Sequence, residues 1–221
     1  VLISATAKWI FSDLKPNNFS IKNSSLNDRL NIFIKLLNND EINYFNGDIG
    51  LEDKYTELTS KLLPKGKTYI GIAPGAGDKS KIWPLNKFIK LAKKQLEQNR
   101  IPVFFLGPDE KDLLEFIKQD VPKAIFPEWT DEAIDSGLKG PILVIALAKK
   151  INVAIANDSG TGHMFATGGT KLISLFSKHN SIKYAPNAKE LVILDSKKWG
   201  GIDPNLIPLE EVEKSINKLL K

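Results

Sequence analysis

Apolar and polar positions follow two different spacings along most of this chain. Short apolar runs, each bounded by glycine, proline or polar residues, occur at 69–73, 101–106, 151–156, 171–176 and 191–194. Runs of this length are typical of buried strands in a parallel sheet. Segments with apolar residues at helical spacing separate them, and those at 84–98 and 141–150 begin at proline, which suits a first helical turn. The alternation predicts an α/β fold, with a Rossmann-like parallel sheet and helices on both faces.

The remaining elements are less strongly marked. Further helices are expected after Asp109 to about residue 119, from Gly160, and from Pro208. Residues 123–126 suggest a short strand. Residues 1–63 carry few strand signals, but two segments there have helical spacing: 26–37 and 51–63, the second stopped by Pro64.

The parallel sheet predicts where a ligand would bind. Ligands of such sheets lie outside the carboxyl ends of the strands. The segments that follow strands are 74–81, 107–110, 157–163 and 177–180. We therefore expect these segments to line one edge of the sheet and to hold the functional residues.

The turn at 157–163 (Asn-Asp-Ser-Gly-Thr-Gly-His) is the most informative of these segments. A strand that leads into a helix N-terminus exposes unpaired amides at the positive end of the helix dipole, which favours phosphate. Its glycines let a ligand approach the backbone closely. The alternative is simple helix capping by Asp158 or Ser159. His163, near the helix start, either donates to a ligand or is satisfied within the fold.

Two other segments offer weaker signals. In 74–84, glycines after a strand can hold phosphate with backbone amides, and Lys79 or Lys81 can add a positive charge. The alternative is a surface turn with Trp83 packed beneath the next helix. Glu110 can accept hydrogen bonds from ribose hydroxyls, whereas Asp109 is expected only to cap a helix.

Composition excludes several kinds of chemistry. The chain has no cysteine and two histidines, which argues against thiolate catalysis and against a metal site. Ser159 lacks the Gly-x-Ser-x-Gly context of a hydrolase nucleophile. The net charge of +5 comes from scattered lysines, which indicate a solvated surface or an anionic partner and not nucleic acid. The chain shows no signal peptide and no membrane span, and without an initiator Met it is expected to be a fragment.

Taken in order, several motifs resemble one known family. They are Gly-Ile-Ala-Pro-Gly-Ala from Gly71, Lys-Ile-Trp-Pro from Lys81, Phe-Ile-Lys-Leu-Ala from Phe88, Val-Phe-Phe-Leu-Gly from Val103, and 157–163. The set resembles the C-terminal half of glycosyltransferase family 9, the ADP-heptose:lipopolysaccharide heptosyltransferases. The resemblance implies a GT-B architecture, with residues 66–221 as the C-terminal nucleotide-sugar-binding domain. Residues 1–65 then correspond to the tail of the N-terminal acceptor domain plus a linker.

The resemblance also implies roles for single residues. The family's phosphate-binding lysine falls on Lys81 and its ribose-binding acid on Glu110, with a one-residue uncertainty against Asp109. Asp158 would contact the donor sugar, and the amides after it the diphosphate; the adenine edge would lie near 138–140. Lys81 and Asp158 are the expected catalytic residues, without a metal. The complete expected donor site is Gly75, Ala76, Lys81, Glu110, Asp158, Ser159, Gly160, Thr161 and His163.

One loop departs from the family pattern. After the strand at 171–176 the family usually has a glycine followed by Thr and Pro, whereas this chain has Ser-Lys-His-Asn at 177–180. The departure leaves the donor sugar open, and His179 is expected to be an exposed loop histidine that does not contact ligand.

The resemblance implies an inverting glycosyltransferase that moves heptose from ADP-heptose to an anionic lipopolysaccharide core precursor. It implies a cytoplasmic enzyme, with peripheral contact to the inner membrane and no cofactor besides the donor substrate. The catalytic base would belong to the N-terminal domain and be absent from this chain. A non-catalytic nucleotide-sugar binding module and a GT-B nucleotide-sugar epimerase remain alternatives.

Overall fold

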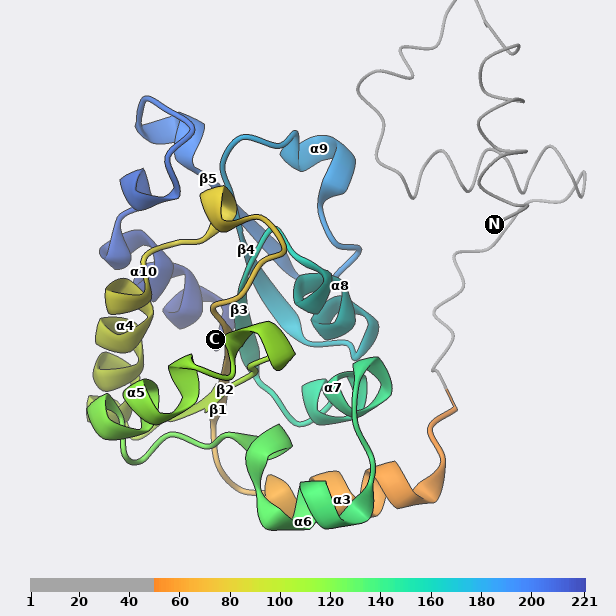
Figure 1. Cartoon of the computed structure of the whole chain (residues 1–221). Coiled ribbons are helices and arrows are strands. Elements are labelled where there is room, and N and C mark those ends of the chain that lie inside the picture. Colours follow the sequence, from red (N-terminus) through yellow and green to blue (C-terminus); the bar gives the residue numbers. More distant parts are fainter. Residues whose placement is uncertain (1–49) are drawn as a thin grey trace, which may run out of the picture. The chain divides into compact units, whose positions relative to one another are not determined.

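The computed structural model describes residues 50–221, so the predicted helix at 26–37 lies outside the described residues. Contacts divide the chain into two units, and the fold below is that of residues 50–181 and 185–221. Its centre is a five-stranded, all-parallel sheet in the order β2-β1-β3-β4-β5 (Figure 1). The strands are β1 (Tyr69–Ala73), β2 (Ile101–Phe104), β3 (Val153–Asn157), β4 (Lys171–Phe176) and β5 (Leu191–Asp195). Each begins and ends within two residues of a predicted run, which confirms the α/β fold.

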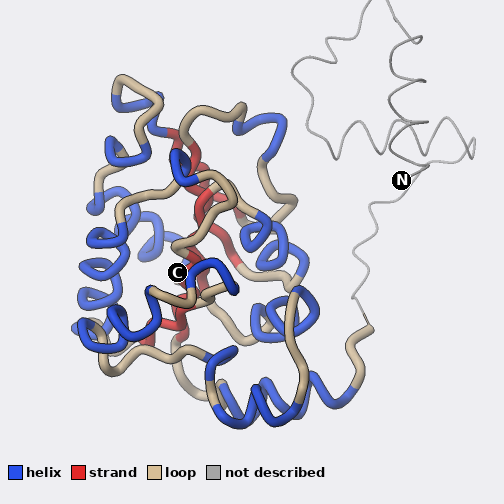
Figure 2. The backbone as a smooth tube through the Cα atoms, in the orientation of Figure 1, coloured by secondary structure: helices blue, strands red, loops and turns tan. Residues whose placement is uncertain are grey.

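Helices cover both faces of the sheet, as Figure 2 shows. The α-helices of this unit are α3 (Asp53–Leu62), α4 (Leu85–Glu97), α5 (Leu113–Asp120), α6 (Asp131–Ser136), α7 (Pro141–Ala148), α8 (Gly160–Thr167) and α10 (Leu209–Leu219), whereas α9 (Ser181–Tyr184) falls almost entirely in the other unit. Short 3-10 turns are η2 (Lys79–Lys81), η3 (Pro108–Glu110), η4 (Pro127–Trp129), η5 (Ser196–Trp199) and η6 (Pro204–Leu206). Buried side chains place α4, α5 and α10 on one face and α3, α7 and α8 on the other.

The central strand β3 shows how the sequence builds the two cores. Val153 and Ile155 point into the cluster under α4 and α10, whereas Ala154 and Ala156 point into the cluster under α7 and α8. All four side chains are fully buried. The small alanines leave room for Phe165 of α8, which is itself fully buried. Each large apolar side chain buried in this way contributes about 1.5–3 kcal/mol.

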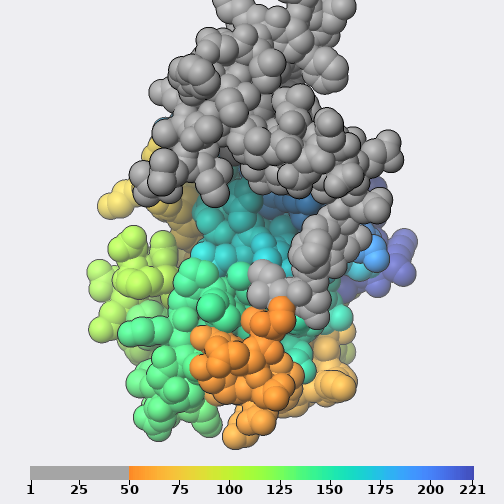
Figure 3. Space-filling model, turned by 90° about the vertical axis from the view of Figure 1, so that its right-hand side faces the viewer, coloured from red at the N-terminus to blue at the C-terminus, as the bar shows by residue number. Residues whose placement is uncertain are grey.

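The helix predicted at 51–63 is present as α3. It is amphipathic, and Tyr55 and Leu58 bury their side chains in the cluster shared with α7. Figure 3 shows α3, in orange, against the green residues of α6 and α7. The helix ends before Pro64, as expected from the missing amide of proline. The domain boundary at residue 65 stays a prediction.

Two local predictions were wrong. Asp109 does not cap a long helix: it is exposed in η3, and α5 begins only at Leu113 with Asp112 at its N-cap. The reason is that the Glu110 side chain accepts a hydrogen bond from the Gly107 amide and closes a tight 3-10 turn first. The strand expected at 123–126 is a single parallel bridge to β2, because η4 begins directly after it.

The strand order creates a topological switch point between β1 and β3. From β1 the chain passes through α4 on one face to β2, and from β3 it passes through α8 on the other face to β4. The connections leave the two central strands in opposite directions, which opens a crevice at their carboxyl ends. The segments 74–81 and 157–163 lie at this crevice, with 107–110 and 177–180 at the ends of the flanking strands. The prediction that these four segments line one edge of the sheet is therefore confirmed.

Candidate functional site

A buried asparagine joins the two loops at the switch point. Asn157, the last residue of β3, donates from Nδ2 to the carbonyl of Pro74 at 2.8 Å. Its Oδ1 accepts from the backbone amide of Trp83 at 3.0 Å. Trp83 is fully buried, and its indole Nε1 donates to the carbonyl of Ile207 at 3.0 Å. These bonds fix both ends of the loop that carries Lys81.

Lys81 and Asp158 form an ion pair between the same two loops. The bonds of Asn157 and Trp83 that hold these loops form the frame of the site. The Lys81 Nζ donates to the Asp158 carbonyl at 2.9 Å and lies 3.2 Å from its Oδ2. Their side chains are only 14% and 9% exposed, so both charges are largely shielded from solvent. The pair therefore joins the loop after β1 to the turn after β3, through two residues that are 77 positions apart in sequence. It also places one ammonium directly beside the N-terminus of α8.

The start of α8 presents a set of backbone amides. Ser159 is the N-cap with extended backbone, but its side chain makes no capping bond. Its Oγ is buried without a hydrogen-bond partner among the described residues. The alternative prediction of helix capping by the side chain of Asp158 or Ser159 is thus wrong, because Asp158 pairs with the Lys81 ammonium instead. A Cβ on Gly160 would meet open space, so a ligand can approach the backbone there.

The first turn of α8 contains the other predicted residues. Gly162 is buried, and a Cβ there would make only ordinary contacts with Ala156 and Pro186. Thr161 is half-buried beside it, and His163 is exposed. The first amides of a helix have no partner within the helix, and the dipole makes this end favourable for an anion.

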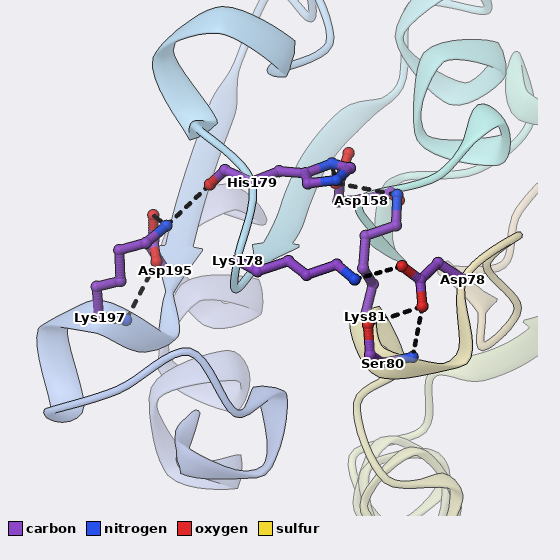
Figure 4. Close-up of polar contacts among 8 residues, drawn as sticks. All are labelled: Asp78, Ser80, Lys81, Asp158, Lys178, His179, Asp195 and Lys197. Carbon is purple, nitrogen blue, oxygen red and sulfur yellow. Dashed lines mark hydrogen bonds and ion pairs between the residues drawn. The ribbon is translucent and has the colours of Figure 1, made fainter.

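The loop after β4, part of the predicted edge segment 177–180, brings two side chains to the site that were not predicted as site residues. His179 Nδ1 lies 2.7 Å from Asp158 Oδ2, and Lys178 Nζ lies 2.5 Å from Asp78 Oδ2 (Figure 4). His179 is 40% exposed, as expected of a loop histidine, and it contacts the Asp158 carboxylate; that it does not contact ligand stays a prediction. The available signal was the position of both residues directly after a parallel strand.

Glu110, in η3 after β2, lies at the other end of the carboxyl edge of the sheet. Its Oε2 accepts from the Gly107 amide at 2.9 Å, and its carboxylate lies so close to Gly75 that an added Cβ would clash with it. Gly75 and Ala76, which follow β1, are half-buried there. Burial and the charge of Glu110 raise the pKa of Glu128, in η4, to about 7. The structure therefore places a carboxylate at the ends of β1 and β2, where a ribose was expected. Residues 138–140, the expected adenine edge, connect α6 to α7.

Two further observations limit the chemistry of the described part of the chain. Within residues 50–221, no cluster of three or more histidine, aspartate or glutamate side chains is arranged to hold a metal ion. In the same residues, no helix has the length and apolar character needed to span a bilayer.

Comparisons with known proteins agree with this arrangement. The family model for glycosyltransferase family 9 (heptosyltransferase) matches residues 22–203. The lipopolysaccharide core heptosyltransferase OpsX of Haemophilus influenzae is 29% identical over 135 residues, which cover 61% of this chain and 37% of OpsX. The chain thus spans well under half the length of that relative.

Solved structures share the fold. The glycosyl transferase family 9 protein from Veillonella parvula superposes with a TM-score of 0.74 at 18% identity, over 89% of this chain and 60% of that one. For the ADP-heptose LPS heptosyltransferase II of E. coli the TM-score is 0.61 at 19% identity, over 77% and 52%. Because the family model covers more than half of the chain, and the sheet matches those of family structures, this chain belongs to glycosyltransferase family 9, the heptosyltransferase family.

Proposed function

We propose that this chain binds the nucleotide-sugar donor of an inverting heptosyltransferase that extends the lipopolysaccharide core. The observation that carries the proposal is the shielded Lys81–Asp158 pair beside the N-terminus of α8, at the switch point of the sheet. This is where a doubly wound sheet binds nucleotides. The named relatives support heptose as the sugar, ADP as the nucleotide and lipopolysaccharide as the acceptor.

The donor lies along the carboxyl edge of the sheet in this proposal. The Glu110 carboxylate, next to Gly75, accepts hydrogen bonds from the ribose hydroxyls. The amides of residues 160–162 and the unpartnered Ser159 Oγ bind the diphosphate at the positive end of α8. Lys81 adds a full positive charge to the same group. Asp158 contacts the sugar hydroxyls.

The chemistry follows from where charge develops. An acceptor hydroxyl attacks the anomeric carbon of heptose, and the bond from that carbon to the diphosphate breaks with inversion. Negative charge grows on the departing diphosphate, so Lys81 and the α8 amides bind the transition state more tightly than the ground state. The sugar gains positive character, which the Asp158 carboxylate stabilises. A base outside the described residues takes the hydroxyl proton.

Two lysines of the same turn provide the binding test. Lys81 contacts Asp158, whereas Lys79, two residues earlier in η2, is exposed. A charge-assisted hydrogen bond contributes about 1.5–3 kcal/mol, so we expect Lys81→Ala to weaken ADP binding roughly 10- to 100-fold in calorimetry. Adenosine binding should change little, and Lys79→Ala should bind both as the wild type does. Equal loss of ADP and adenosine affinity in Lys81→Ala would contradict the assignment.

Turnover provides the second test. In the complete protein, Asp158→Ala should lose nearly all transfer of heptose to a lipopolysaccharide core acceptor. Mass spectrometry of the product measures this transfer. Near-normal transfer would refute the role of Asp158. Donor binding without transfer would favour a non-catalytic binding module, and an altered donor sugar without acceptor would favour an epimerase. We also propose that the enzyme acts in the cytoplasm and contacts the membrane peripherally, since the proposed acceptor is lipid-linked.

A further inference from the structure

The loop after β4 carries a lysine that the proposed function does not use. Lys178 Nζ pairs with Asp78 Oδ2 on the loop after β1, and these side chains are 37% and 43% exposed. Asp78 Oδ1 also accepts from the amide and hydroxyl of Ser80, at 2.9 and 2.7 Å. The Lys178 ammonium and these bonds hold the pKa of Asp78 well below its usual range. The pair therefore consists of two charged side chains, on the loops that follow β1 and β4, next to the proposed donor site.

Neighbouring contacts hold this loop against the site. His179 lies 2.7 Å from the Asp158 carboxylate, and Lys197 Nζ donates to the His179 carbonyl at 2.8 Å. Figure 4 shows Lys178 extending from the loop towards Asp78, on the same side of the site as Lys81. Lys178 is thus placed by its neighbours beside the Lys81–Asp158 pair.

The strand order says which part of a donor would face Lys178. In the sheet, β2, β1, β3 and β4 are consecutive neighbours. Glu110 follows β2, the α8 amides follow β3, and Lys178 follows β4. A donor whose ribose lies at Glu110 and whose diphosphate lies at α8 therefore runs towards β4. For such a donor, the outer phosphate, the one bonded to the sugar, is the phosphate that would face the loop carrying Lys178, whose ammonium reaches back to Asp78 on the loop after β1.

We propose that Lys178 is a further donor-binding residue, which exchanges its bond with Asp78 for one with the outer phosphate of the nucleoside diphosphate sugar. This inference rests on the proposed function. An ion pair as exposed as Lys178–Asp78 stabilises a fold only weakly, so breaking it costs little. A diphosphate carries more charge than one carboxylate and already lies in the field of α8 and Lys81. Asp78 therefore holds the lysine in place until the donor arrives.

The exchange predicts opposite effects for the two partners of the pair. In Lys178→Ala we expect ADP to bind about tenfold more weakly, the loss of one charge-assisted bond, and AMP less than about twofold more weakly. Asp78→Asn frees the lysine, so ADP should bind as well as in the wild type or more tightly. Lys93→Ala is the matched control: Lys93 also pairs with an aspartate, Asp120, at 2.9 Å, but on α4, away from the carboxyl edge. It should leave both affinities unchanged.

Calorimetry of the full chain with ADP and AMP measures these affinities, and thermal unfolding checks that each variant folds. If Lys178→Ala binds ADP normally, the inference is overturned. If Asp78→Asn loses ADP affinity as Lys178→Ala does, the pair only supports the loop and the inference is overturned too. Should Lys81→Ala weaken ADP while Lys178→Ala does not, the proposed function stands without this inference. A wild type that binds no ADP overturns both.

Discussion

Replacing Asn157 by alanine tests whether the frame of the site rests on one amide. The side chain is fully buried and bonds to backbone: Nδ2 donates to the carbonyl of Pro74 and, at 3.4 Å, to that of Gly75, and Oδ1 accepts from the Trp83 amide. Alanine removes all three bonds at once. It leaves a buried carbonyl and a buried amide without a hydrogen bond, since Pro74 and Trp83 are themselves buried.

The size of the effect follows from those two groups. A buried polar group left without its partner costs about 1–3 kcal/mol, so the free energy of unfolding should fall by about 2–5 kcal/mol. For a domain of this size each kcal/mol corresponds to about 2–4 °C, which predicts a drop in Tm of roughly 5–15 °C. ADP affinity should fall as well, because Lys81 lies two residues before Trp83.

Asn152 gives a matched control just before the same strand. It is exposed, and its Oδ1 accepts one bond, from the Tyr69 amide at 2.8 Å. Asn152→Ala leaves one backbone amide without its partner, so it should lose about 1–3 kcal/mol, roughly half of the loss expected for Asn157→Ala. Thermal and urea unfolding of both variants measure the difference. If Asn157→Ala is no less stable than Asn152→Ala, the two loops are held by something other than this amide, and the reasoning fails.

Two further substitutions address the nucleoside end of the site. In Gly75→Ala the new Cβ would clash with Glu110 Oε1, so the carboxylate must move. Calorimetry should then show weaker adenosine binding. Unchanged adenosine affinity would contradict the role of Glu110 in binding the ribose. Glu128 has its pKa raised from 4.5 to about 7, so the folded state holds this proton more tightly than the unfolded state. The free energy of unfolding should therefore fall by up to about 3 kcal/mol as pH rises from about 4.5 to 7. Glu128→Gln should remove that fall and be more stable than the wild type at pH 8, as followed by Tm against pH; a parallel pH profile would refute the assignment.

The parts of the fold that sequence predicts well are those fixed by local patterns. The five strands could be located because buried parallel strands are continuous apolar runs, and the parallel order placed 74–81 and 157–163 at one edge. Pairings between distant segments could not be predicted. Local rules favour Asp158 as a helix cap, but the fold brings Lys81 and His179 to its carboxylate, and the Lys81 ammonium competes better for it than backbone amides do. The prediction for Asp109 was wrong because residues 108–110 close a 3-10 turn and α5 begins only at Leu113, which leaves no helix start at Asp109.

The site contains two kinds of polar contact: neutral hydrogen bonds, which hold its loops in place, and ion pairs, which the proposed donor would exchange. Asn157 and Trp83 hold the loops with neutral hydrogen bonds that are buried, so replacing them costs the full burial penalty of each group. Lys81, Asp158, Lys178 and Asp78 pair with one another nearer to solvent. In the proposed function the diphosphate takes over these cations, while His179 stays beside the Asp158 carboxylate and Ser80 keeps its two bonds to Asp78. A site of that kind is ordered before the donor binds, and under this proposal the binding energy of the diphosphate is then available for the transition state.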